Sequence, residues 1–216
     1  MVNLRVALAQ TCPINAEVGS DNISDPFSTI EQNLLDVKER VKIASEEGAE
    51  VVVFPEYFLQ GLVDQGRQVS LLQDTLIMGL TLQYLCYSSR HLITYLNHLA
   101  REFNISIVGT IVHADTQGLP DKSPFAHLYT SAERETEAWS NFVRDHPVTN
   151  HSPKLRNVAF YIEGSTGKVV DEYAKRNLWH PERDYLTPGD AGHQVFDTRW
   201  GKCAFLICKS TLFGFG

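Results

Sequence analysis

The sequence predicts a layered α/β domain, in which helices pack against a sheet of strands. Short apolar runs that fit buried strands alternate with longer segments whose apolar residues recur every three or four positions, as on one face of a helix. The composition agrees, because 43% of the 216 residues are hydrophobic and 21% are charged, values close to those of ordinary globular proteins. We therefore expect one globular domain of generous size.

The first part of the chain predicts a strand, a helix and a second strand. Residues 6–9 form an apolar run that fits a first strand in a buried sheet. The helix that follows begins at a capping box, Ser28 with Glu31 three residues later, and ends at Gly48. Residues 51–54 fit a strand that is apolar on both faces. The apolar stripe of the helix consists of Ile30, Leu34, Val37, Val41 and Ala44.

The alternation continues and then breaks. A second helix is predicted over Leu92, Leu96, Leu99 and Phe103, and a strand follows at residues 105–112. Residues 118–156 are polar and contain four prolines, which predicts an insertion or a long surface excursion.

The last third predicts a β-hairpin and one further strand. Residues 157–163 and 168–174 are β-rich and are joined by a turn with a glycine at each end, residues 164–167. Residues 201–208, GKCAFLIC, predict a buried strand that finishes at Cys208.

Charge and cysteine usage disfavour several kinds of partner. The chain has 19 Lys and Arg against 26 Asp and Glu, a net charge of −7, and no long basic run, so neither nucleic acid nor an anionic membrane surface is expected. No segment reaches the roughly 18 apolar residues of a membrane span, and the start does not fit a secretory signal, which favours the cytoplasm. The four cysteines have no regular spacing, so we expect neither a disulfide framework nor a metal site.

Three candidate catalytic residues each lie just beyond a predicted strand, where loops hold reactive groups on a rigid sheet. They are Glu56, Lys175 and Cys208. Each has an ordinary alternative: a buried small hydrophobe for the cysteine, and a solvated side chain for the glutamate and the lysine. Together they fit nucleophilic catalysis, because a thiol attacks as the thiolate and needs a nearby cation or base. Lys175 would be the cation and Glu56 the base.

Four segments, in this order, resemble the carbon-nitrogen hydrolase family, also called the nitrilase superfamily. They are VALAQ near the start, VVVFPEYFLQG around Glu56, YAKRNLWHPERDYLTPG around Lys175, and GKCAFLIC up to Cys208. The resemblance implies a nitrilase-type α-β-β-α sandwich and matches Glu56, Lys175 and Cys208 to the catalytic triad of the family. Glu182, seven residues after the lysine, looks like the second glutamate that many members place near the active site; a surface carboxylate is the alternative.

The resemblance also implies the reaction. Glu56 would take the thiol proton, and Cys208 would add to the carbon of a small amide, carbamoyl or nitrile substrate to form a thioester, which water then hydrolyses. Lys175 and the backbone N–H of Lys209 would stabilise the charge that develops on the substrate. No metal and no organic cofactor is needed.

Two aromatic residues flank the matched segments. Tyr57 and Trp179 are expected to line the substrate pocket, with ordinary packing as the alternative. Members of the family commonly assemble from several copies, so the resemblance also implies a homo-oligomer.

The sequence departs from the family after Cys208. The family continues there with an aromatic residue and an aspartate and then with further strands and helices, whereas this chain has residues 209–216, KSTLFGFG. We therefore expect a single carbon-nitrogen hydrolase domain over residues 1–208, an atypical tail over 209–216, and a sandwich whose C-terminal part is missing. The alternative to an active hydrolase is an inactive fragment or pseudoenzyme that associates with complete subunits.

A third hypothesis pairs Cys208 with a histidine, for instance His180 or His193, as in Cys-His hydrolases. No local sequence signature supports that pairing.

Overall fold

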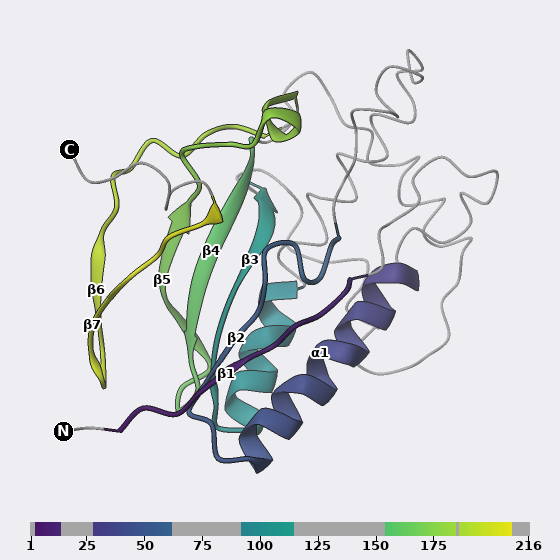
Figure 1. The fold of residues 1–216 in the computed structure, drawn as a ribbon, viewed down its shortest axis with the longest axis vertical. Coiled ribbons are helices and arrows are strands. Elements are labelled where there is room, and N and C mark those ends of the chain that lie inside the picture. The colour runs from purple at the N-terminus through teal and green to yellow at the C-terminus, as the bar shows by residue number, and fades with distance from the viewer. Residues whose placement is uncertain (1–2, 14–27, 62–91, 115–153, 185, 209–216) are drawn as a thin grey trace.

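The computed structural model of the protein describes residues 3–13, 28–61, 92–114, 154–184 and 186–208, which contain a five-stranded sheet (Figure 1). The strands lie in the sheet in chain order; the first three are parallel, and each of the last two is antiparallel to the strand before it. Their bounds are β1 (Val6–Leu8), β2 (Val51–Val53), β3 (Ser106–Ala114), β4 (Leu155–Glu163) and β5 (Lys168–Ala174).

Two helices, α1 (Ser28–Glu46) and the helical residues 92–102, lie on one face of the sheet and pack into its main core (Figure 1). Both predicted apolar stripes are confirmed where side chains are described, although Phe103 follows the second helix and the side chain of residue 30 is not described. Neither helix is long and apolar enough, within the described residues, to cross a membrane. The buried stripe residues are Leu34, Val37, Val41, Ala44, Leu92, Leu96 and Leu99.

α1 ends at Glu46 and is capped by Gly48, the glycine predicted to end it. Gly48 has a φ of 76°, its N–H donates to the carbonyl of Ser45 at 2.9 Å, and the next N–H, of Ala49, donates to Ala44 at 2.9 Å. A left-handed residue after a helix suits glycine, which has no Cβ to clash. The helix also begins at the predicted Ser28, but the capping-box side chains lie outside the described part of the chain.

A hairpin of β6 (Val195–Thr198) and β7 (Gly201–Ala204) lies on the opposite face of the sheet (Figure 1). The residues that follow β7, Phe205 and Ile207, join it to β4 and β5 through a second apolar cluster. The described residues therefore have the helix, sheet, sheet order of the predicted sandwich. The buried members of this cluster are Ala159, Tyr161, Tyr173, Phe205 and Ile207.

Two predictions of burial were wrong. Val6 and Leu8 are 45% and 77% exposed, because β1 is the edge strand of the sheet and these side chains alternate with Ala7, which faces the helices. Residues 201–208 were predicted to be one buried strand, but β7 ends at Ala204 and its four residues are exposed. β7 pairs only with β6 in a two-stranded ribbon, so burial is confined to the side chains that reach β4 and β5.

Element boundaries in the last third also differ from the prediction. The hairpin of β4 and β5 is confirmed, but β4 begins at Leu155, which pairs with Ala114, so the polar excursion predicted over 118–156 ran two residues into a strand. Residues 118–153 of that excursion lie outside the described chain. The sequence did not predict β6 or the 3-10 helix η2 (His180–Asp184), because both are too short to show periodicity.

Gly109, in β3, lies where the sheet meets the ring of Phe58. A Cβ atom at this position would lie 2.5 Å from Cε1 of Phe58 and 3.3 Å from Cζ of Phe160. Both rings are buried, and Phe58 stacks on Phe54 with 4.6 Å between ring centroids, so neither ring can move without repacking the core. We predict that Gly109→Ala lowers the free energy of unfolding by about 1–3 kcal/mol, measured by urea denaturation.

Gly192→Ala is the matched control, because a Cβ atom at Gly192 would meet nothing within 4 Å. Its free energy of unfolding should stay within about 0.5 kcal/mol of the wild-type value. An equal loss in both variants would contradict the tight packing assigned to Gly109.

Candidate active site

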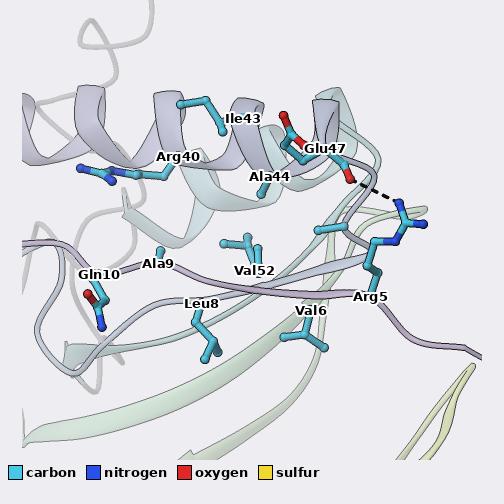
Figure 2. Close-up of a pocket in the computed structure, with 12 residues that line it drawn as sticks. Arg5, Val6, Leu8, Ala9, Gln10, Arg40, Ile43, Ala44, Glu47 and Val52 are labelled. Atoms are coloured by element: carbon cyan, nitrogen blue, oxygen red, sulfur yellow. Dashed lines mark hydrogen bonds between the residues drawn. The ribbon is translucent and has the colours of Figure 1, made fainter.

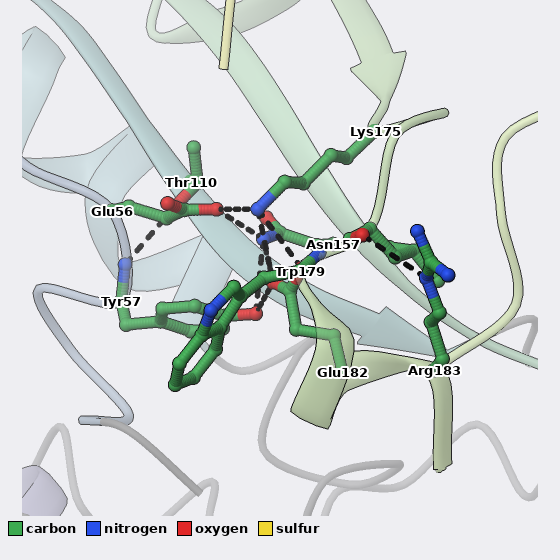
Figure 3. A network of polar contacts seen from close by, with 9 residues as sticks. Glu56, Tyr57, Thr110, Asn157, Lys175, Trp179, Glu182 and Arg183 are labelled. Atoms are coloured by element: carbon green, nitrogen blue, oxygen red, sulfur yellow. Dashed lines mark hydrogen bonds and ion pairs between the residues drawn. The ribbon is translucent and has the colours of Figure 1, made fainter. Parts of the chain in front are cut away.

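Lys175, Glu56 and Glu182, predicted from two separate segments, meet at one point (Figure 3). The Nζ atom of Lys175 lies 2.7 Å from Oε1 of Glu56 and 2.9 Å from Oε2 of Glu182. The side chains of Lys175 and Glu182 are each 1% exposed, whereas that of Glu56 is 24% exposed. The solvated alternatives considered for Lys175 and Glu182 are therefore wrong, and Glu56 is the carboxylate of the pair that solvent reaches.

Glu56 lies in the turn that follows β2, and contacts to β3 hold this turn in place. The N–H of Tyr57 donates to Oγ1 of Thr110 at 3.1 Å. The side chain of Gln60 accepts from the N–H of Val112 at 2.6 Å and donates to its carbonyl at 3.1 Å. Tyr57 has a φ of 62°, a left-handed conformation that costs free energy in a bulky residue and persists only where the surroundings enforce it.

Lys175 and Glu182 are held by the chain on the other side of the site. Lys175 directly follows β5, and its N–H donates to the carbonyl of Asn157 in β4 at 2.8 Å, which extends the ladder between the two strands. Glu182 lies in η2, where its Oε2 accepts from the N–H of Trp179 at 2.6 Å. The hydroxyl of Tyr57 donates to Oε1 of Glu182, so the two halves of the site are linked directly.

These contacts set the charges of the buried pair. Burial alone would raise the pKa of Glu182, but hydrogen bonds from Tyr57, Lys175, Trp179 and Asn157 outweigh it and hold that pKa below its ordinary value of 4.5. Burial alone would lower the pKa of Lys175, but the hydrogen bonds and charges of the two glutamates outweigh it and raise that pKa above 10.5. The site therefore holds an ammonium ion and an ionised Glu182 at neutral pH.

Asn157, in β4, belongs to the site although the sequence analysis did not single it out. It is fully buried, and its Nδ2 lies 2.7 Å from Oε1 of Glu56 and 3.0 Å from Oε1 of Glu182. The signal available in the sequence was one amide inside the apolar run of β4, where a buried polar side chain needs a partner.

Cys208 is exposed, so the alternative of a small buried hydrophobe is wrong for it. It follows Phe205 and Ile207, which are 8% and 4% exposed and packed on β4 and β5. These are the strands that contain Asn157 and lead into Lys175. The φ of Cys208 is 46°, so the chain turns sharply at the thiol-bearing residue, as it does at Tyr57 beside Glu56.

The other predicted residues occupy different surroundings. The ring of Tyr57 is buried and its hydroxyl faces the glutamates, whereas Trp179 is 45% exposed and contributes its backbone N–H. Lys209 lies outside the described residues. His180 is exposed, and His193 stacks on Tyr173 with its Nδ1 3.2 Å from the carbonyl of Phe205.

A groove between β1 and α1 is separate from this site (Figure 2). Its lining includes Arg5, Arg40 and Glu47 and shares no residue with the cluster around Lys175. Within the described parts of the chain, no three His, Cys, Asp or Glu side chains gather as a metal site would require.

Comparisons with known proteins identify the family and the fold. The carbon-nitrogen hydrolase family model matches residues 5–214. Solved structures of an amidase from Nesterenkonia sp. share the fold: one superposes with a TM-score of 0.57 at 17% identity, covering 95% of this chain and 55% of the amidase. A mutant of this amidase, described as belonging to the nitrilase superfamily, gives 0.59 at 17% identity, covering 97% and 57%.

A further mutant of the amidase, in which acrylamide has added to the active-site cysteine, gives a TM-score of 0.58 at 16% identity and covers 95% and 57% of the two chains. These superpositions confirm the predicted nitrilase-type fold. The chain spans a little over half the length of these solved structures. A search of curated proteins finds no match.

The lowered pKa of Glu182 gives a pH-dependent prediction for Glu182→Gln. A carboxylate whose pKa is lower in the folded than in the unfolded chain stabilises the fold above the unfolded pKa, and that stabilisation is lost as the pH falls through the folded pKa. At pH 7 the variant should be less stable than the wild type by about 3 kcal/mol, because a buried ion pair loses one partner. The difference should narrow as the pH falls below 4.5, measured by urea denaturation at a series of pH values.

Glu172→Gln is the control, because Glu172 is an exposed carboxylate on β5. Its stability should follow that of the wild type at every pH. A Glu182→Gln deficit that stays constant down to pH 3 would contradict the ionised state assigned to Glu182.

Proposed function

Because the chain belongs to the carbon-nitrogen hydrolase family, we propose that it hydrolyses the carbon–nitrogen bond of a small amide, with Cys208 as nucleophile, Glu56 as general base and Lys175 as the donor to the developing oxyanion. The observation that carries this proposal is the arrangement around Lys175: a buried ammonium ion between two carboxylates, of which only Glu56 is open to solvent.

The difference in exposure supports different roles for the two glutamates. A general base must reach the proton that it abstracts, and Glu56 is the carboxylate on the accessible side of the cluster. Glu182 accepts hydrogen bonds from four donors, so its carboxylate holds Lys175 and Tyr57 in position and is not free to take a proton from the thiol. We assign Glu182 to positioning and Glu56 to proton transfer.

Lys175 suits the stabilisation of an oxyanion. An ammonium group has three hydrogens, and the two carboxylates require one each, so one remains for a substrate oxygen. A fixed positive charge in a site of low solvent exposure stabilises developing negative charge without reorganisation. The raised pKa keeps this charge in place across neutral pH.

The proposed reaction balances without any added group. Glu56 accepts the thiol proton as the sulfur of Cys208 bonds to the amide carbon, and the proton passes to the leaving nitrogen, so that ammonia or an amine departs from a thioester. Glu56 then takes a proton from water, the hydroxide adds to the thioester carbon, and the carboxylic acid leaves as the thiol is restored. The net change is amide plus water to acid plus amine.

A small amide is preferred over a nitrile or carbamoyl substrate because the solved structures that share the fold are those of an amidase from Nesterenkonia sp.. Tyr57 and Trp179 remain proposed lining residues of the substrate pocket.

The test is ammonia release from a panel of small aliphatic amides and nitriles by the whole chain and by Cys208→Ala. We predict release by the wild type and a loss of at least about 1000-fold in Cys208→Ala, because the nucleophile is removed. Cys203→Ala is the matched control, since Cys203 is also exposed but lies in β7, and it should keep wild-type activity.

Absence of ammonia release from folded wild-type protein would contradict the proposal and favour the alternative of an inactive relative that associates with complete subunits. Equal activity in the wild type and Cys208→Ala would contradict the role of Cys208 while leaving hydrolysis established.

A further inference from the structure

The two carboxylates of the site approach the same side-chain nitrogen. Besides Nζ of Lys175, Oε1 of Glu56 and Oε1 of Glu182 share Nδ2 of Asn157, at 2.7 and 3.0 Å (Figure 3). Two ionised carboxylates this close repel each other, and each raises the free energy of the charged state of the other. One ammonium ion offsets one of the two negative charges, so a further hydrogen-bond donor between the two carboxylates reduces their repulsion.

An amide nitrogen has two hydrogens, and Nδ2 of Asn157 lies closest to the two carboxylate oxygens. The hydroxyl of Tyr57 accepts from the same Nδ2 at the longer distance of 3.1 Å and donates its own proton to Glu182. Oδ1 of Asn157 is buried and has no hydrogen-bond partner among the described residues. The amide is thus held through its nitrogen, which fixes the direction in which it donates.

The backbone of the same residue holds the cation. The carbonyl of Asn157 accepts the N–H of Lys175 at 2.8 Å, and Asn157 itself is fixed in β4 opposite Val112. One fully buried residue therefore sets the position of Lys175 through its main chain and of both glutamates through its side chain.

From this geometry we infer that Asn157 is a positioning residue of the hydrolase, a neutral bridge whose side-chain N–H groups bind Glu56 and Glu182 and align both beside Lys175. The inference rests on the proposed function, because it concerns the alignment of Glu56 as the general base. The charged and titratable groups that face Glu56 in this cluster are Lys175 after β5 and Glu182 in η2, with the Tyr57 hydroxyl behind Glu182.

Asn157→Asp tests the bridge, because it keeps the shape of the side chain but replaces the donor by a third carboxylate. We predict that kcat/KM for the amide hydrolysed by the wild type falls at least about 100-fold at pH 7. The acid limb of the pH profile of kcat/KM should move upward by about one pH unit or more, because the ionised base has lost a donor and gained a like charge.

Asn33→Ala is the matched control. Asn33 is another buried asparagine, 5% exposed, whose Nδ2 donates to the carbonyl of Leu59 at 2.8 Å, in the turn that contains Glu56. If Asn33→Ala only weakens the structure of this region, it should lower the stability of the fold and leave the acid limb of the kcat/KM pH profile at the wild-type position. If the limb is also unmoved in Asn157→Asp while the wild type is active, the inference is overturned and the proposed function stands.

A second readout does not depend on activity. In the double variant Asn157→Asp/Glu182→Gln the donor and the acceptor exchange places, so a hydrogen bond between these positions can form again with the original net charge. We predict that the Tm of the double variant exceeds that of Asn157→Asp by roughly 3 °C or more, while hydrolysis is not rescued, because Glu56 still faces a carboxylate at position 157.

The outcomes separate the two proposals. A double variant no more stable than Asn157→Asp would overturn the bridge, whatever the activity of the chain. Rescue of Tm in a chain whose wild type releases no ammonia would contradict the proposed function and leave the bridging contacts in place, but the positioning role in catalysis would fall with that function.

Discussion

Lys175 carries a positive charge at a point where its side chain is 1% exposed, and the site depends on how that charge is balanced. Removing an ammonium ion from water costs several kcal/mol, and opposite charges offset that cost only when they lie in direct contact. Glu56 and Glu182 supply that contact from separate parts of the chain. The turn after β2, the end of β5 and η2 converge at this point, and a fold that brought neither glutamate to Lys175 would leave a buried charge without compensation.

The sheet makes this convergence possible. β2 and β5 both end at the side of the sheet where β4 begins, because β4 runs antiparallel to β3 and β5. Residues that follow β2 and β5 therefore lie beside the first residues of β4, which include Asn157.

Contacts from Thr110 and Val112 of β3 fix the turn that contains Glu56. The second cluster ties Phe205 and Ile207 to the same two strands, which is how the segment ending at Cys208 is held against the part of the sheet that supports the charged cluster.

The sequence predicts features that depend on neighbouring residues better than features that depend on contacts between distant parts of the chain. The α1 stripe and its end at Gly48 depend on neighbouring residues, and both were predicted correctly. The hairpin of β4 and β5 is equally local, because its turn is encoded at residues 164–167. The exposure of Leu8 and of β7 depends on which strands have neighbours, which no local pattern encodes. For Glu182 the sequence left open whether the side chain lies at the surface or in the site, because only tertiary contacts determine its burial. Asn157 gave only the weak signal of one amide in an apolar strand.

The central claim is that Lys175 is an ammonium ion held between the carboxyl groups of Glu56 and Glu182, in a member of the carbon-nitrogen hydrolase family. The most direct measurement is a pH titration of the Lys175 side chain, followed by the NMR chemical shifts of its ε carbon and ζ nitrogen with the Lys175→Arg variant used for assignment. The account predicts shifts typical of a charged amine at neutral pH and a titration midpoint above 10.5, since the two glutamates raise the pKa of Lys175 above that ordinary value. A Lys175 that is neutral at pH 7, or that titrates below 10.5, would contradict it.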